Sequence, residues 1–77
     1  MTANLGLRWG ALIAARRADL HLSQSALADL CSVSQQTISK IERGLMVPLD
    51  PLKLRLAAGL DVHPGDLFPW PEPVPIA

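Results

Sequence analysis

The 77-residue sequence contains one cysteine, one phenylalanine, two tryptophans and no tyrosine. A single cysteine cannot form an internal disulfide, and there is no second thiol with which it could bind a zinc ion. No apolar run approaches the ~18 residues that a membrane span needs, and the N-terminus lacks the layout of a secretory signal peptide. Clustered His, Cys, Asp and Glu residues and a Gly-rich phosphate loop are also missing, which argues against an enzyme, a metal site or a cofactor. We expect a cytoplasmic domain that has no contact with membranes.

The charged residues sum to zero, but their distribution along the chain is uneven. Residues 1–56 contain all seven basic side chains and four of the seven acidic ones, a net charge of +3. Residues 57–77 contain three acidic side chains and no basic one. This separation permits an anionic partner for the first part of the chain.

Start and stop signals predict an all-α domain made of five short helices. Ser23, Ser34 and Asp50 are N-cap candidates, and Gly44 is a natural helix stop. Pro51 and Pro64 each suit the first turn of a helix, where a missing N–H costs nothing. The predicted helices cover residues 5–20, 24–30, 35–43, 50–59 and 63–68.

Prolines at every second position from Pro69 to Pro75 forbid a helix and favour an extended arm. We therefore divide the chain into a helical domain, residues 1–68, and a Pro-rich C-terminal arm, residues 69–77. The arm could lie across its own domain or bind a protein partner.

The second and third predicted helices, each opened by a serine and separated by about three residues, indicate a helix-turn-helix. The outer face of residues 35–43 lacks large apolar side chains, and Glu42 is its one acid. Such a helix fits the major groove, where glutamine pairs with adenine and lysine reaches guanine or a phosphate. Amides at the helix starts suit phosphates. The pattern predicts binding to double-stranded DNA.

The stretch SQSALADLCSVSQQTISKIERG resembles the helix-turn-helix of the XRE family, the class of the lambdoid-phage repressors and Cro. The resemblance implies a lambda-repressor-like fold and a set of functional residues. It implies base contacts by Gln35, Gln36, Ser39 and Lys40, phosphate contacts by Gln24, Thr37 and Arg43, and a structural ion pair between Arg17 and Glu42.

Three positions depart from the family pattern. Ser32 occupies a turn position that is usually glycine, so it must accept a positive φ. Asp61 stands in place of the glycine that usually follows the fourth helix. Lys53 stands where a buried leucine is expected, which leaves the register of that helix open by one residue.

A single short helix makes few base contacts, and related proteins pair about a two-fold axis that sets the recognition helices ~34 Å apart. We therefore expect a homodimer on a near-palindromic operator. More apolar residues follow the fourth helix than so small a core is expected to bury. This surplus predicts a dimer interface formed by Leu60, Val62, Leu67, Phe68 and Trp70.

Several alternatives remain open at this point. A transcription repressor of a phage or mobile element, similar to Cro, is the first interpretation. A restriction–modification controller and an antitoxin-type module that masks a protein partner are the others, and a helix-turn-helix can also serve only as a packing unit. Cys31 is either a core residue or a redox-sensitive thiol. His21 and His63 lie near predicted helix boundaries and suit turns or caps better than metal binding.

Overall fold

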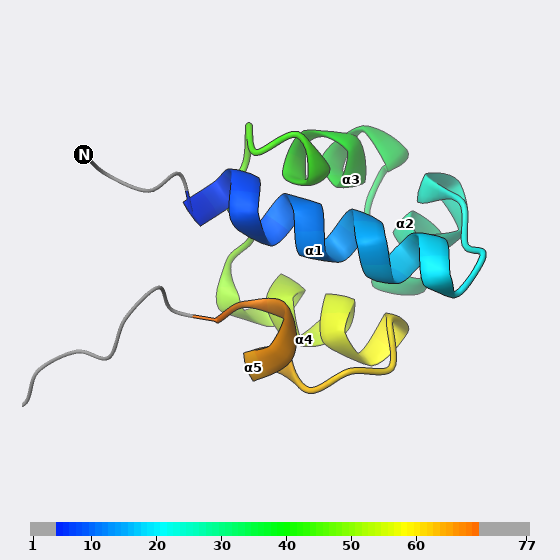
Figure 1. Ribbon diagram of the computed structural model, residues 1–77. Helices are drawn as coiled ribbons and strands as arrows, with labels where there is room; N and C mark the ends of the chain where they lie inside the picture. Colours follow the sequence, from blue (N-terminus) through cyan, green and yellow to red (C-terminus); the bar gives the residue numbers. More distant parts are fainter. Residues whose placement is uncertain (1–4, 70–77) are drawn as a thin grey trace, which may run out of the picture.

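The computed structural model describes residues 5–69, which form five α-helices and, within that range, no strand. In chain order the helices are α1 (Leu5–Asp19), α2 (Gln24–Cys31), α3 (Gln35–Glu42), α4 (Asp50–Gly59) and α5 (Pro64–Leu67). α1 crosses the middle of the molecule, with α3 on one side of it and α5 on the other (Figure 1). The predicted all-α architecture is confirmed. Apart from Pro69, the predicted arm lies outside the described residues.

Three helix starts are capped by the side chains that the sequence indicated. The hydroxyl oxygens of Ser23 and Ser34 each accept the backbone N–H three residues further on, at 3.0 and 3.2 Å. His63 accepts the N–H of Gly65 through Nδ1 at 3.0 Å. Each bond satisfies one of the donors that a helix start leaves without an intrahelical partner.

The first four helices end in the same way. A residue in the left-handed region follows each helix, and the next N–H donates to the carbonyl oxygen five residues back, at 2.9–3.0 Å. The left-handed residues are His21, Ser32, Gly44 and Asp61, with φ of 57°, 58°, 76° and 55°. This is the Schellman geometry, for which glycine is the usual choice. Ser32 therefore takes the predicted positive φ.

The predicted cap of α4 is wrong by one residue. Leu49 is the N-cap and forms no side-chain cap bond, whereas Asp50 is the first helical residue. The Asp50 carboxylate lies 3.5 Å from Lys53 Nζ. An acidic side chain in the first turn interacts favourably with the helix dipole, so Asp50 favours this helix start without capping it.

A single cluster of buried apolar side chains holds the five helices together. Its members are Trp9, Ile13, Leu27, Ala28, Cys31, Ile38, Ile41, Leu52, Leu56, Ala57, Leu60, Leu67 and Phe68. Leu60, Leu67 and Phe68 thus belong to the chain's own core, which corrects the prediction that they form a dimer surface. The core absorbs them because α5 folds back against α1, where the rings of Trp9 and Phe68 meet edge to face with centroids 5.3 Å apart. Val62 is partly buried against the same core, and Trp70 lies outside the described residues.

Gly10 allows α1 to approach α3 closely. A Cβ atom at this position would lie 2.4 Å from the carbonyl oxygen of Ile41 and 2.5 Å from that of Glu42. Backbone atoms of a packed helix cannot move aside as a flexible side chain can. A glycine in the middle of α1 therefore fixes how near the end of α3 lies.

Lys53 replaces a core leucine without disturbing the helix that carries it. Its Nζ lies 4.5 Å from the centroid of the Trp9 ring and 5.7 Å from that of Phe68. A lysine stem can cover apolar surface while its ammonium group rests over aromatic faces near solvent. Leu52 and Leu56 are buried, so the apolar stripe predicted for α4 faces the core as expected.

Candidate nucleic-acid interface

α3 presents a polar face that points away from the core. Gln35, Gln36, Lys40 and Arg43 are exposed, and Ser39 is partly exposed. Spacings of one, three and four residues place these five side chains on one side of a helix. Ile38 and Ile41 occupy the opposite side and are fully buried. Packing therefore fixes which face of α3 a ligand can reach.

Most polar side chains on this face are not committed to intramolecular bonds. Within residues 5–69, Gln35, Gln36 and Lys40 form no side-chain hydrogen bond or ion pair. Arg43 Nε donates to the Ser39 carbonyl at 3.3 Å, which leaves the outer nitrogens of the guanidinium group to other acceptors. The face can therefore offer several donors and the two glutamine acceptors to a partner.

The residues expected to contact phosphates lie at the edges of this face. Thr37 is partly exposed in the first turn of α3, and its hydroxyl lies 3.0 Å from that of Ser34. Gln24 is the first residue of α2 and is half-buried. Both positions lie beside helix starts, where backbone amides favour anions.

Arg17 and Glu42 form the ion pair that the resemblance implied. Arg17 Nε and Nη2 donate to the two carboxylate oxygens of Glu42 at 2.6 and 3.0 Å, and Nη1 donates to the Leu22 carbonyl at 2.8 Å. The hydrogen bond to Glu42 raises the pKa of Arg17 above its ordinary value. The pair joins α1 to the last residue of α3 and so helps to fix how α3 is presented.

A third member of this network had no clear signal in the sequence. Gln24 Nε2 donates to Glu42 Oε1 at 3.0 Å, so one carboxylate receives bonds from α1 and from α2. The two residues are 18 positions apart, and only the packing of α2 on α3 brings the start of one helix to the end of the other.

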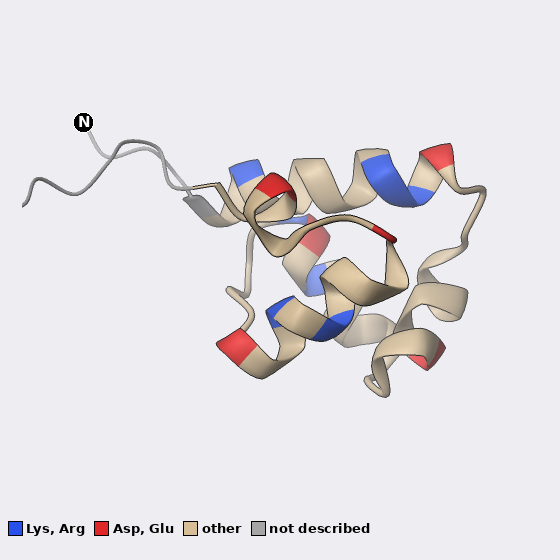
Figure 2. Ribbon diagram, turned by 90° about the horizontal axis from the view of Figure 1, so that it is seen from below, with Lys and Arg blue, Asp and Glu red and all other residues tan. Residues whose placement is uncertain are grey.

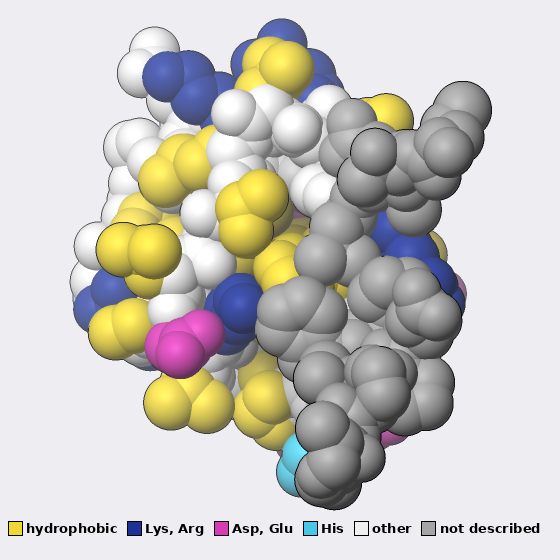
Figure 3. All heavy atoms as spheres, turned by 90° about the vertical axis from the view of Figure 1, so that its left-hand side faces the viewer, with side chains coloured by type: hydrophobic (Ala, Val, Ile, Leu, Met, Phe, Trp, Pro, Cys, Tyr) yellow, Lys and Arg dark blue, Asp and Glu magenta, His cyan; other side chains and the backbone are white. Residues whose placement is uncertain are grey.

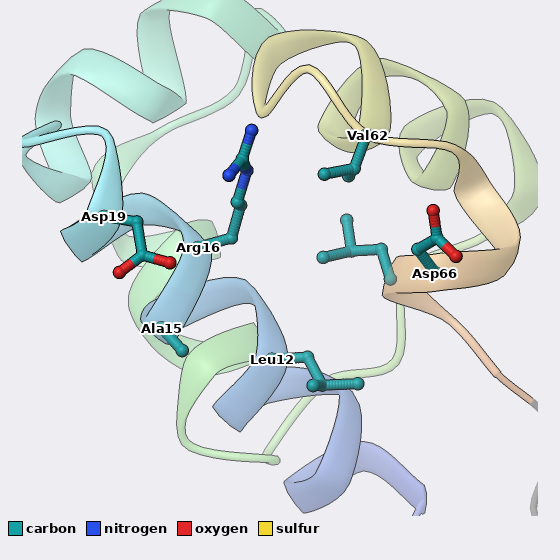
Figure 4. A pocket seen from close by; sticks show the side chains of 7 residues that line it. Leu12, Ala15, Arg16, Asp19, Val62 and Asp66 are labelled. Carbon is teal, nitrogen blue, oxygen red and sulfur yellow. The ribbon is translucent and has the colours of Figure 1, made fainter.

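Basic and acidic side chains are unevenly placed on the surface. Lys40 and Arg43 stand on the outer face of α3, and the acid at its end, Glu42, is neutralised by Arg17. The acidic residues of the last part of the domain lie around the α4–α5 loop and α5, which Figure 2 shows from below. Asp66 and Asp19 line a pocket there together with Arg16 (Figure 4), and Lys53 and Arg55 lie on α4. What distinguishes the outer face of α3 is that Lys40 and Arg43 stand on it while its one acid, Glu42, is paired with Arg17.

The remaining candidate residues have structural surroundings. Cys31 is completely buried, and burial raises the pKa of its thiol, an effect that the nearby charge of Arg55 only partly offsets. His63 caps α5, and His21 occupies the left-handed turn after α1, so the predicted turn and cap roles are confirmed.

Among residues 5–69, no group of three or more His, Cys, Asp and Glu side chains could hold a metal ion. No helix in this range is both long and apolar enough to cross a bilayer.

Sequence inspection missed an exposed apolar surface next to the end of α3. We call it the apolar edge and define it as Leu7, Leu45, Met46, Val47 and Leu49, which are 40–79% exposed. Leu7 joins the loop residues because it lies against Gly44. Figure 3 views the molecule from this side and shows hydrophobic side chains spread over it. The apolar run between Gly44 and Asp50 is the signal that could have revealed this edge.

Comparisons with known proteins agree with this geometry. A family model described as Helix-turn-helix (HTH_3) matches residues 13–67. The solved structure of the restriction-modification controller protein C.AhdI from Aeromonas hydrophila has a TM-score of 0.79 and 30% sequence identity, and the match covers 82% of this chain and 96% of that one. The clp gene regulator ClgR from C. glutamicum has a TM-score of 0.77 and 27% identity, with 82% of each chain covered. A comparison with curated proteins found no match.

Proposed function

The chain belongs to the helix-turn-helix family HTH_3, and from this premise we propose that it represses transcription as a homodimer on a near-palindromic operator. It is a DNA-binding transcription regulator of the helix-turn-helix class. In this proposal α3 enters the major groove, where Gln35, Gln36, Ser39 and Lys40 contact bases. Gln24, Thr37 and Arg43 contact phosphates on either side.

One observation carries the proposal. The outer face of α3 is polar and exposed, and its side chains form few hydrogen bonds within the protein, while its inner face is buried in the core. Glutamine and lysine on a rigid helix are suited to reading base edges in the major groove. The chain has no net charge, so non-specific attraction to DNA is weak. Affinity must then come from specific contacts made by two copies.

The apolar edge is the surface that we propose for pairing. It begins one residue after the turn that ends α3, so two copies joined there would bring the ends of their α3 helices together. Contiguous exposed apolar patches mark interaction sites, and a stable interface buries about 800 Å² on each partner, the contribution of roughly 20–30 residues, whereas this edge has five. Pairing through this edge is therefore weak alone and is strengthened when both copies bind one DNA duplex. Repression follows if the operator overlaps a promoter.

Selection of bound duplexes from a random pool at near-physiological salt tests the proposal. We expect an enriched palindrome whose half-sites are about ten base pairs apart, one helical turn of DNA. A single enriched half-site would contradict the dimer, and no enrichment would contradict sequence-specific binding.

A restriction–modification controller is the second candidate. The observation in its favour is the similarity to C.AhdI, since this chain matches nearly the whole of that controller at 30% identity. A neighbouring restriction endonuclease or methyltransferase gene would favour the controller, and a phage integration or lysis gene would favour the repressor of a mobile element.

A further inference from the structure

The side-chain amide of Gln24 is held in one orientation by Glu42. An ionised carboxylate can only accept hydrogen bonds, so the amide must turn its nitrogen, and not its oxygen, toward Glu42. The bond between Gln24 Nε2 and Glu42 Oε1 measures 3.0 Å, and only 7% of the Glu42 side chain is exposed. Arg17 in turn holds Glu42 by two bonds, so the acceptor itself cannot swing away.

This orientation matters for what Gln24 can do outside the protein. An amide nitrogen carries two hydrogens, and the bond to Glu42 uses one of them. The second is left for an acceptor beyond the helix, beside the backbone amides at the start of α2, which have no partner inside the helix. A reversed amide would instead present its oxygen there and repel a phosphate oxygen.

We propose that Glu42 is a positioning residue for DNA binding: it locks the Gln24 amide with a hydrogen directed at the phosphate backbone. Arg17 contributes by neutralising Glu42 and holding it in place, so that the carboxylate sits beside DNA without repelling it. The inference rests on the proposed function, in which Gln24 contacts a phosphate.

A double-mutant cycle tests the inference. Glu42→Gln keeps the size of the side chain but removes the obligatory acceptor, so the Gln24 amide can turn either way. Its affinity for a fluorescein-labelled duplex of the selected sequence is compared with wild type by anisotropy, and the same substitution is repeated in a Gln24→Ala background. Glu42→Gln should weaken binding by roughly tenfold in the wild-type background, because charged hydrogen bonds are lost. The loss should be clearly smaller once Gln24 is absent, because only the weakened bonds between Glu42 and Arg17 then remain to affect binding.

The sign of the effect separates positioning from charge. Removing a negative charge next to DNA should by itself strengthen binding, so a loss of affinity runs against simple electrostatics. An equal loss of affinity in both backgrounds would mean that Glu42 acts only through its pair with Arg17 or through the fold, and that result would overturn the inference. If wild type binds no duplex at all, the proposed function fails first, and the two failures are thereby distinguished.

A second measurement uses the wild-type protein and does not depend on any variant folding. The two side-chain amide protons of Gln24 have separate NMR signals. We expect one to be protected from solvent exchange in the protein alone and the other to shift when the duplex is added. Equal exchange of both protons, or no shift on adding DNA, would overturn the inference.

Discussion

The polar side chains proposed to contact DNA differ in how many of their hydrogen-bonding groups already have a partner within the protein. Gln35 and Gln36 are exposed and make no side-chain hydrogen bond within residues 5–69. Thr37 and Gln24, in contrast, are already bonded to Ser34 and Glu42. Side chains whose donors and acceptors are both available can discriminate between bases, whereas a donor held in one direction suits the uniform phosphate backbone. Substitutions of the two kinds of residue should therefore have different effects on sequence preference.

Gln36→Ala should relax the preference for one base pair of the operator and weaken binding to the preferred sequence by ~1–3 kcal/mol. The control variant Arg43→Ala should weaken binding to all sequences alike and reduce the salt dependence, because it removes one positive charge. Competition titrations with the operator and its single-base variants measure both effects. An unchanged preferred sequence for Gln36→Ala would mean that α3 docks in another register.

Cys31 should make the fold sensitive to alkaline pH. Burial raises the pKa of its thiol, so the unfolded chain loses the thiol proton at a lower pH than the folded chain does. Stability is then fully present below the thiol's unfolded pKa, about 8.5, and falls as the pH rises toward the folded value. Urea unfolding at pH 7 and pH 10 should show a larger loss for wild type than for Cys31→Ala. Equal losses in the two proteins would contradict this prediction.

Among the secondary-structure elements, those governed by local chemistry were predictable and those governed by packing were not. Ser23 and Ser34 reveal their helix starts in the sequence because a cap depends on residues within one turn. Leu60 and Phe68 were assigned to a dimer surface because nothing local shows that α5 returns to cover α1. Gln24 was correctly placed at a helix start, but its bond to Glu42 depends on how two helices cross. The exposed polar face of α3 was predictable because it depends only on the register of that helix.

Gly10 gives a direct test of the packing between α1 and α3. Alanine is the better helix former by up to ~1 kcal/mol, so Gly10→Ala would stabilise an isolated helix. Here its Cβ would lie 2.4 Å from a backbone oxygen of Ile41, so we expect the variant to lower the free energy of unfolding by ~1–3 kcal/mol. Gly59→Ala is the matched control, because the nearest atoms to its Cβ would lie at 3.5 Å or beyond.

Urea titrations followed by circular dichroism measure both glycine variants. Gly59→Ala should be neutral or slightly stabilising. If Gly10→Ala were equally harmless, α1 and α3 would not be in the close contact described, and the position of α3 relative to Arg17 would have to be revised.

At the scale of the whole molecule, the proposed function assigns the polar face of α3 to DNA and the apolar edge to a second copy. The face of α3 carries Lys40 and Arg43, the acidic residues Asp61 and Asp66 lie on the α5 side, and the apolar edge adjoins the end of α3. In the proposed dimer an edge of five residues is too small to bind tightly alone. If two copies bind one duplex as proposed, a weak contact between them is strengthened by their high effective concentration on the DNA. Disrupting the edge should therefore affect the palindrome much more than the half-site.

Leu49→Glu provides that disruption at the most exposed position of the apolar edge, where the leucine is 79% exposed and contributes little to the core. Two introduced carboxylates would face each other across a two-fold contact and repel, so affinity for the palindrome should fall by roughly tenfold or more, that is ~1.4 kcal/mol. Affinity for an isolated half-site and the free energy of unfolding should stay nearly unchanged.

Leu30→Glu on α2 is the matched control, since that leucine is also exposed but lies beside Gly59, away from the edge. Light scattering measures the oligomeric state, and titrations with the palindromic and half-site duplexes measure the two affinities. Equal effects of the two variants would show that the added charge, and not the loss of a dimer contact, weakens binding.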